Sequence, residues 1–215
     1  VLIKEGVPVK PGDIVFTVEG KVQSILQAER IMLNIMQRMS GVATATNKYV
    51  ALIEGTGAKV LDTRKTTPGM RMIEKHAVKL GGGENHRIGL FDMILLKDNH
   101  IDFAGGIENA IIGANSYLEE KNKSLKIEIE VRDMDELNEV LRVGGVDRVM
   151  LDNFTPEETK KAVKLVNGRI EVESSGGITS ETIRSYAEAG VDYISVGALT
   201  HSVKGLDMSL IATTI

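Results

Sequence analysis

Charged side chains stand at the carboxyl ends of five short apolar runs, where they could support chemistry. If these runs are parallel strands, their carboxyl ends converge on the face that carries the active site in β/α barrels. Charge at five of six such ends is costly for a purely structural core. Strand ends also leave the core and meet solvent, which would account for one or two of them. The five residues are Asp62, Lys97, Glu130, Asp152 and Glu173.

A basic cluster occupies residues 64–100, which contain seven Lys or Arg against four Asp or Glu and three of the four histidines. Arg64, Arg87 and Lys97 lie beside expected turns and strand ends. They could line a pocket for a small polyanion, because guanidinium groups match the geometry of carboxylate and phosphate.

Part of this cluster is expected to be a solvated helix surface. Arg71, Lys75 and Lys79 follow one another at intervals of four residues and therefore share one helical face. His76 is also most simply a residue of this helix surface.

Two glycine-containing loops follow the last two apolar runs. Ser-Ser-Gly-Gly at 174–177 precedes a helix expected near Thr179, and Val-Gly-Ala at 196–198 follows the next strand. Loops after the last strands of a barrel often bind phosphate through backbone N–H groups, and glycine lets the backbone approach closely. Each loop alone could be an ordinary turn, but the two together favour a phosphate site.

The metal chemistry that the sequence suggests is that of a hard cation. Glu130 and Asp152 could share Mg²⁺ with substrate oxygens, or they could pair with the basic cluster, and the sequence leaves both roles open. A zinc site is not indicated, because no His or Cys pair has a suitable spacing.

Alternating strands and helices are expected to position these residues. Helical spacing of apolar residues predicts a long helix over residues 29–55, with Gly41 as its point of potential breakage. Six strand–helix units then predict a parallel sheet closed into an open β/α barrel, with an open doubly wound sheet as the alternative. A further strand could lie around residues 88–90. Asp133, Thr155 and Thr179 are expected helix starts, and Gly144, Gly168 and Gly190 are expected stops.

The first residues read as the end of another domain. Residues 6–13 predict a turn and residues 14–19 a strand. Because one short strand pair cannot fold alone, we expect a preceding N-terminal segment. The expected organisation is a remnant of an N-terminal α/β domain over 1–28, a connecting helix over 29–55, and a catalytic β/α barrel over 56–215.

Composition excludes several functional classes. The net charge of −4 and the pI near 5.7 argue against nucleic-acid and anionic-membrane binding. No apolar run approaches the roughly 20 residues that span a bilayer, and no signal-peptide pattern is visible. The absence of cysteine excludes disulfides and thiolate chemistry, and it fits a cytoplasmic location.

Several of these motifs together resemble the quinolinate phosphoribosyltransferases, also called carboxylating nicotinate-nucleotide pyrophosphorylases. The stretch 61–71 reads Leu-Asp-Thr-Arg-Lys-Thr-Thr-Pro-Gly-Met-Arg, 81–90 reads Gly-Gly-Gly-Glu-Asn-His-Arg-Ile-Gly-Leu, and 94–100 reads Ile-Leu-Leu-Lys-Asp-Asn-His. The resemblance covers the chain from about Glu29 to its end, with motifs in the family's order. The further matching stretches are 29–30, 40–44, 151–154, 173–177 and 196–202.

This resemblance implies an activity and an assembly. The family transfers ribose 5-phosphate from phosphoribosyl pyrophosphate to quinolinate and decarboxylates the adduct to nicotinate mononucleotide for NAD synthesis. Its fold is an N-terminal α/β domain on an open β/α barrel. Its active form is a homodimer, which can build higher oligomers, and one subunit completes its neighbour's site.

The resemblance also implies roles for individual residues. Lys65, Lys97, Glu130 and Asp152 would be the catalytic set, with Glu130 and Asp152 taking the ribose hydroxyls and Mg²⁺ and Lys65 the phosphoribosyl pyrophosphate. The residues implied around quinolinate are Arg64, beside Thr63, with His86, Arg87, Lys97 and Arg30 of the adjoining subunit. Those implied around the 5-phosphate are Ser175, Gly176, Gly177, Val196, Gly197, Ala198 and His201.

Two other functions remain open at this point. A lyase could use Lys97 as a Schiff-base nucleophile at a strand end, although so many arginines exceed what a single phosphate needs. A non-catalytic relative could bind a nucleotide or an anion such as molybdate, although a pure binder would not need Lys65, Glu130 and Asp152 together.

Overall fold

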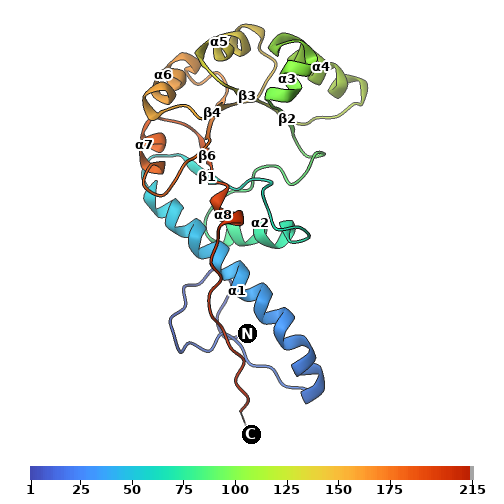
Figure 1. The fold of residues 1–215 in the computed structure, drawn as a ribbon, viewed down its shortest axis with the longest axis vertical. Coiled ribbons are helices and arrows are strands. Elements are labelled where there is room, and N and C mark those ends of the chain that lie inside the picture. The colour runs from blue at the N-terminus through green and yellow to red at the C-terminus, as the bar shows by residue number, and fades with distance from the viewer. Residues whose placement is uncertain (214–215) are drawn as a thin grey trace.

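The structure is a computed structural model that describes residues 1–213, and it consists of one parallel sheet surrounded by helices (Figure 1). The six predicted strands are all present and each is followed by helical structure, which confirms the α/β class. The elements are α1 (Val22–Leu52), β1 (Lys59–Leu61), α2 (Arg71–Leu80), β2 (Ile94–Leu96), α3 (Asp98–Ala104), α4 (Ile107–Glu120), β3 (Ile127–Val131), α5 (Met134–Val143), β4 (Arg148–Asp152), α6 (Pro156–Val166), β5 (Glu171–Ser175), α7 (Ile183–Glu188), β6 (Tyr193–Ser195) and α8 (Ala198–His201).

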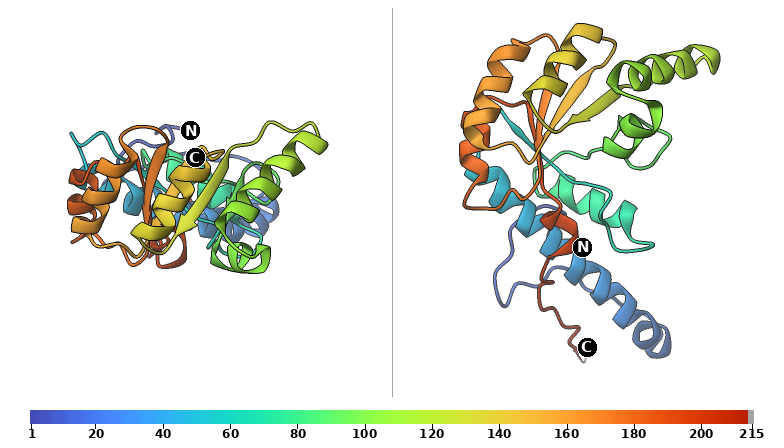
Figure 2. Two further views of the ribbon diagram at one scale, coloured as in Figure 1. Left: turned by 90° about the horizontal axis from the view of Figure 1, so that it is seen from above. Right: turned by 45° about the horizontal axis from the view of Figure 1, so that its top comes forward.

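The sheet curves into an open barrel. Its strand order is β1-β6-β5-β4-β3-β2 and all pairings are parallel, so β1 and β2 are its two edges. Helices α3 to α7 lie outside the ring of strands (Figures 1 and 2). A doubly wound sheet would carry helices on both faces, so the barrel is the correct alternative.

The additional strand expected near residues 88–90 is not formed. These residues make a series of bends, because the Ile88 and Gly89 N–H groups donate to the Asp92 carboxylate at 2.7 and 2.9 Å instead of to a strand. The chain instead meets β1 further upstream, through a parallel bridge between Leu61 and Glu84.

The two faces of the strands have opposite chemistry. Strand residues point alternately to either face, and Ile129, Val149 and Val172 pack into the apolar core beneath the outer helices. The alternate positions, among them Glu128 and Glu173, face the inside of the barrel and are also buried. The polar groups are therefore held inside the ring of strands.

A repeated Gly-Val-Asp sequence pins the register at the other end of the barrel. Asp147 and Asp192 each end one copy. The Asp147 carboxylate accepts the Ile127 N–H at 2.7 Å, and the Asp192 carboxylate accepts the Val172 N–H at 2.8 Å. The backbone N–H of each aspartate donates back to the same residue's carbonyl, at 2.8 and 2.9 Å. These reciprocal bonds lock β3 to β4 and β5 to β6.

The long helix begins and ends earlier than predicted. It spans Val22–Leu52 instead of 29–55. It starts early because no Gly or Pro lies between Gly20 and Glu29, and it ends shortly before Gly55, which adopts a left-handed φ of 81°. It continues unbroken through Gly41. No helix among residues 1–213 is long and apolar enough to cross a membrane.

The segment before this helix is irregular. The predicted turn is present, since the Asp13 N–H donates to the Lys10 carbonyl at 3.1 Å. The strand predicted over residues 14–19 is not formed, because no neighbouring strand pairs with it. Its backbone contacts are the Leu2 and Ile3 N–H groups, which both donate to the Val15 carbonyl.

The predicted helix ends are largely confirmed. Thr155 caps α6 in a reciprocal capping box with Glu158, and Asp133 caps α5. Gly144 follows α5 directly, whereas Asn167 in left-handed conformation comes before Gly168 at the end of α6. Helix α7 begins at Ile183, not at Thr179, because Thr179 forms a separate turn with Thr182.

Gly41 allows the residues after α8 to cross the long helix, and substituting it should be costly. A β-carbon there would lie 2.4 Å from the Lys204 carbonyl oxygen and 2.9 Å from Val203 Cγ1. We expect Gly41→Ala to lower the free energy of unfolding by about 1–3 kcal/mol, despite the better helix propensity of alanine.

Gly113→Ala in α4 is the matched control. A β-carbon there meets nothing within 4 Å, so stability should rise by about 0.5–1 kcal/mol. Denaturant titration of both variants would contradict this account if Gly41→Ala were the more stable.

Candidate active site

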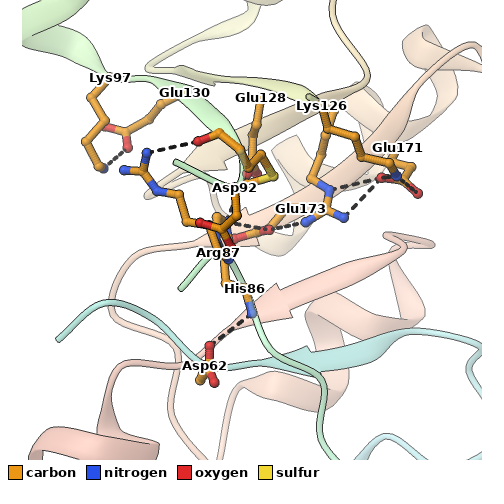
Figure 3. Close-up of polar contacts among 12 residues, drawn as sticks. Asp62, His86, Arg87, Asp92, Lys97, Lys126, Glu128, Glu130, Glu171 and Glu173 are labelled. Carbon is orange, nitrogen blue, oxygen red and sulfur yellow. Dashed lines mark hydrogen bonds and ion pairs between the residues drawn. The ribbon is translucent and has the colours of Figure 1, made fainter. Parts of the chain in front are cut away.

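The predicted basic cluster gathers at the carboxyl ends of the strands. Lys97 follows β2 and forms an ion pair with Glu130 of β3. The Arg87 side chain extends toward this pair (Figure 3). Burial lowers the pKa of Arg87, and the Arg64 guanidinium nearby lowers it further. Two arginines held this close favour a bound anion between or beside them.

Lys65 contacts the segment that follows β6, the last strand of the barrel. Its carbonyl accepts the Thr200 hydroxyl at 2.7 Å, and its N–H donates to Thr63 Oγ1 at 3.0 Å. A β-carbon on Gly197 would lie 3.0 Å from His201 Nε2 and 3.5 Å from Lys65 Cδ. Lys65, Gly197 and His201 therefore surround one spot at the end of β6.

The two glycine loops are close-packed at the same end. Gly176 has a φ of 95°, and a β-carbon there would lie 2.2 Å from Asn153 Oδ1. Any other residue would therefore push away the turn that follows Asp152 and β4. Ser175 belongs to this contact, because its carbonyl accepts the Asn153 N–H at 2.9 Å.

In the second loop, Val196 belongs to the barrel, whereas Gly197 and Ala198 lie at the start of α8. The Val196 N–H donates to the Leu61 carbonyl at 2.9 Å, so it holds β6 to β1 and is occupied within the barrel. Gly197 precedes α8, which starts at Ala198. The phosphate roles predicted for both loops and for His201 remain predictions. The residues concerned are Ser175, Gly176, Gly177, Val196, Gly197, Ala198 and His201.

A second set of polar residues lies deeper in the barrel. It combines His86 and Glu173, which the sequence had indicated, with Glu128 and Arg148, which were not among the predicted site residues. His86 Nε2 lies 2.9 Å from Glu128 Oε2 and 3.6 Å from Glu173 Oε2. All three residues are buried, and these contacts are not aligned as linear hydrogen bonds. Arg148 completes the set, since its Nη1 donates to Glu173 at 3.1 Å and its guanidinium also bonds Glu171. The sequence signal is the alternation Glu128-Ile-Glu130, which places one carboxylate below the other on the same face.

Burial changes the charge states of this deeper set. It raises the pKa of Glu128 to about 7, and burial together with the neighbouring Glu128 raises the pKa of Glu173 to about 8. Burial also lowers the pKa of His86. At neutral pH the His86 imidazole is therefore neutral, and the Glu128 and Glu173 pair is partly protonated.

The tautomer of His86 weighs against a metal ion at this position. The three side chains offer ligand atoms within 4.8 Å of one another. The Arg87 N–H, however, donates to His86 Nδ1 at 2.8 Å. A neutral imidazole that accepts at Nδ1 carries its proton on Nε2, which is the nitrogen that faces both glutamates. That nitrogen therefore has no lone pair for a metal, and it lies 2.9 Å from Glu128 Oε2 in a contact that is not aligned as a hydrogen bond.

Two of the five strand-end charges are structural. Asp62 is fully buried and forms an ion pair with Lys75, which also donates to the His86 carbonyl at 3.0 Å. Asp62 accepts the His86 N–H at 2.9 Å, and burial raises its pKa to about 6. Glu173 belongs to the deeper set. Lys97, Glu130 and Asp152 remain as the strand-end groups at the open face.

The solvated helix face predicted on α2 is wrong for two of its three residues. Lys75 is only 2% exposed, because it reaches inward to Asp62. Arg71 is half-buried and bonds the two loops beside it. Lys79 is exposed, and so is His76, which lies 3.5 Å from Glu5. The helical spacing was correct, but spacing alone does not say which side faces the core.

The structure does not bring two of the predicted site residues to this face: His86 lies in the deeper set, and Arg30 lies on α1. It is exposed on the part of α1 that projects away from the barrel (Figure 1). This placement is compatible with its predicted role toward an adjoining subunit, which remains a prediction.

The fold and this face together define a β/α barrel suited to binding small anions. Family comparison narrows the class. A family model described as "Quinolinate phosphoribosyl transferase, C-terminal domain" matches residues 42–211, and the model of the N-terminal domain matches residues 1–40. The chain belongs to the quinolinate phosphoribosyltransferase family.

Individual relatives agree with this assignment. The chain is 48% identical over 207 residues to the chloroplastic nicotinate-nucleotide pyrophosphorylase (carboxylating) of Arabidopsis thaliana, which covers 90% of this chain and 59% of the relative. It is 42% identical to the probable enzyme of that name from Bacillus subtilis, over 98% of this chain and 71% of the relative. The crystal structure of NadC from Streptococcus pyogenes superposes with a TM-score of 0.91 at 42% identity, over 98% of this chain and 72% of that one.

The chain spans about three fifths of the length of the curated plant relatives. Some of them carry chloroplastic or mitochondrial in their names, so the cytoplasmic location remains a prediction.

The buried carboxyl pair should make stability depend on pH through Glu173. Its pKa is higher in the folded chain than the ordinary 4.5, so the folded state holds the proton more tightly. The resulting stabilisation is full below pH 4.5 and is lost as pH rises toward about 8. Glu173→Gln should therefore gain stability relative to the parent between pH 5 and pH 8, by on the order of 1–3 kcal/mol.

Denaturant unfolding at several pH values measures this difference directly. Glu119→Gln, which changes an exposed glutamate of α4, is the control and should keep a constant offset from the parent. A constant offset for Glu173→Gln as well would show that Glu173 holds no extra proton in the folded state.

Proposed function

We propose that this chain is the catalytic part of a quinolinate phosphoribosyltransferase. The reaction transfers ribose 5-phosphate from phosphoribosyl pyrophosphate to quinolinate and decarboxylates the adduct, giving nicotinate mononucleotide, CO₂ and pyrophosphate for de novo NAD synthesis. The observation that carries the proposal is the gathering of Arg64, Arg87 and Lys97 beside Glu130, in a chain of this family.

Quinolinate would bind through its two carboxylates to the basic cluster. Neither Arg64 nor Arg87 forms an ion pair with a carboxylate of residues 1–213, and a dicarboxylate could bind both of them. Lys97 would then exchange Glu130 for a substrate carboxylate, which releases Glu130 toward the ribose. The main contribution of the protein is orientation, because the ring nitrogen must face the anomeric carbon.

The transfer step needs opposite charges at two places. As the bond from the anomeric carbon to the diphosphate breaks and the bond to the ring nitrogen forms, the ribose becomes oxocarbenium-like. Glu130 and Asp152 would stabilise its positive charge, and Lys65 the negative charge of the leaving diphosphate. The ring nitrogen of the adduct is cationic, so it can accept the electrons left when the adjacent carboxylate departs as CO₂.

The residues present fit a magnesium ion. Mg²⁺ commonly takes one or two protein carboxylates together with substrate phosphates, and Glu130 and Asp152 lie on neighbouring strands. Their contacts with Lys97 and Asn153 each involve one carboxylate oxygen, Glu130 Oε2 and Asp152 Oδ2. When bound, the ion would neutralise charge on the diphosphate.

The alternative of a Schiff-base lyase receives little support. A nucleophilic lysine is usually desolvated or set beside another cation, whereas Lys97 is 44% exposed and ion-paired with Glu130. The alternative of a pure anion binder would leave Glu130 and Asp152 without a task at the open face.

Incubating the full-length protein with quinolinate, phosphoribosyl pyrophosphate and Mg²⁺ should release CO₂ and pyrophosphate. Arg87→Ala should lower kcat/KM by at least about a hundredfold with little change in stability, because a charge-assisted contact to the substrate is lost. Arg142→Ala, which removes an exposed arginine paired with Glu108 on the outer helices, is the control. Absence of product from the parent protein, or normal turnover of Arg87→Ala, would overturn the respective claim.

We further propose that the active form is a homodimer with a shared pocket. The projecting part of α1 exposes Val22, Leu26 and Ile31, which are 69%, 61% and 65% exposed. Exposed apolar side chains gathered on a projecting segment are typical of a surface covered by another chain. Arg30 lies beside it, where it could reach a neighbour's basic cluster.

Mixing two inactive variants tests the shared pocket. An Arg30→Ala subunit paired with an Arg87→Ala subunit forms one intact pocket, made from Arg87 of the first and Arg30 of the second. Random reassortment should therefore restore about a quarter of the parental activity. Recovery of no activity from a mixture shown to contain heterodimers would mean that Arg30 serves its own chain.

A further inference from the structure

Arg71 connects the two segments that carry the arginines of the anion site. It is the first residue of α2, and its guanidinium donates in three directions. Nε donates to Thr66 Oγ1 at 3.1 Å and Nη2 to the Arg64 carbonyl at 3.4 Å, both in the loop after β1. Nη1 donates to the Ile88 carbonyl at 3.2 Å, in the segment that continues from Arg87.

These two segments need such a connection. Arg64 and Arg87 repel each other, and the main-chain contacts between their segments lie below them, at Leu61 and Asp62 with Glu84. Within residues 1–213, no backbone hydrogen bond joins 63–70 to 86–92. Side-chain contacts must therefore set the distance between the two arginines.

We propose that Arg71 is a positioning residue that fixes the spacing of Arg64 and Arg87, and thereby the selectivity of the site for a dicarboxylate with adjacent carboxylates. The proposal rests on the function proposed above. A rigid pair of guanidinium groups can engage both carboxylates of such a ligand together, whereas a loose pair would lose part of that binding to ordering the loops.

The chemistry of the contact requires arginine. Three nitrogen atoms of one planar group reach three acceptors on different sides, and a lysine ammonium, a single nitrogen, cannot span them. Substitution by lysine therefore keeps the positive charge and removes the connection.

The effect should be confined to one substrate. The Lys65 carbonyl is held by the Thr200 hydroxyl at 2.7 Å, and Arg71 bonds neither residue. The phosphoribosyl pyrophosphate end of the site should therefore keep its geometry when Arg71 is changed.

Steady-state kinetics of Arg71→Lys and Arg71→Gln in the full-length protein test the proposal. The KM for quinolinate should rise about ten- to a hundredfold in both variants, while the KM for phosphoribosyl pyrophosphate stays within about twofold of the parent. Lys79→Gln removes an exposed positive charge from the same helix and should match the parent for both substrates. Thr66→Val, which removes the acceptor of Nε, should raise the quinolinate KM less and should not add to Arg71→Lys.

Several outcomes would overturn the inference. Parental kinetics in Arg71→Lys would mean that Arg71 contributes charge only. Equal increases in both KM values would indicate a general loss of structure, and the decision would then rest on Thr66→Val. If that variant did not raise the KM for quinolinate selectively, the proposal would be wrong. A parent without turnover refutes the proposed function instead. In that case, calorimetric binding of phthalate to the parent and to Arg71→Lys decides whether the spacing role exists, and equal affinities would refute it.

Discussion

The contact of His86 with Glu128 and Glu173 holds together a barrel whose edge strands are far apart in the sheet order. Because β1 and β2 are the two edges, backbone pairing does not close the ring between them. The segment after α2 fills this seam, and it is tied to β1 through Asp62 and to the inner face of β3 and β5 through the His86 ring. Between β1 and β2, side-chain contacts thus hold the barrel together, as strand pairing does elsewhere in the sheet.

Such a closure is costly, since carboxylates are desolvated inside the ring. Two ion-paired groups offset part of this cost: Lys75 with Asp62, and Arg148 with Glu173 and Glu171. Arg148 also stacks 3.9 Å from the centroid of the Tyr193 ring. The remaining carboxyl charge is reduced by the raised pKa values of Glu128 and Glu173. Replacing one partner would leave the other unpaired, so these groups are more sensitive to substitution than a surface ion pair.

The barrel interior therefore has two polar layers with different tasks. The lower layer is buried and lies among other protein groups, and it holds the backbone of Arg87 through the Nδ1 atom of His86. The upper layer contains Lys97, Glu130 and Asp152, and it lies open at the carboxyl ends of the strands. His86 was expected beside the substrate, but both of its ring nitrogens face protein groups instead of the open site.

The sequence by itself determined the strand–helix alternation, the six strands, the basic cluster and the family, because these depend on local periodicity and on motifs contiguous in the chain. Spacing also predicted the helix that contains Arg71 and Lys75, but only packing decided that Lys75 reaches inward and that Arg71 bonds the neighbouring loops. The contact of Glu128 with His86 and Glu173 joins residues from three segments far apart in the sequence, so no local pattern could reveal it. The register signal of Asp147 and Asp192 was present as a repeated tripeptide, yet its role became visible only once the strands were paired. Tertiary structure alone separated the charges that close the barrel from those that remain free for a ligand, because burial is a property of the assembled fold.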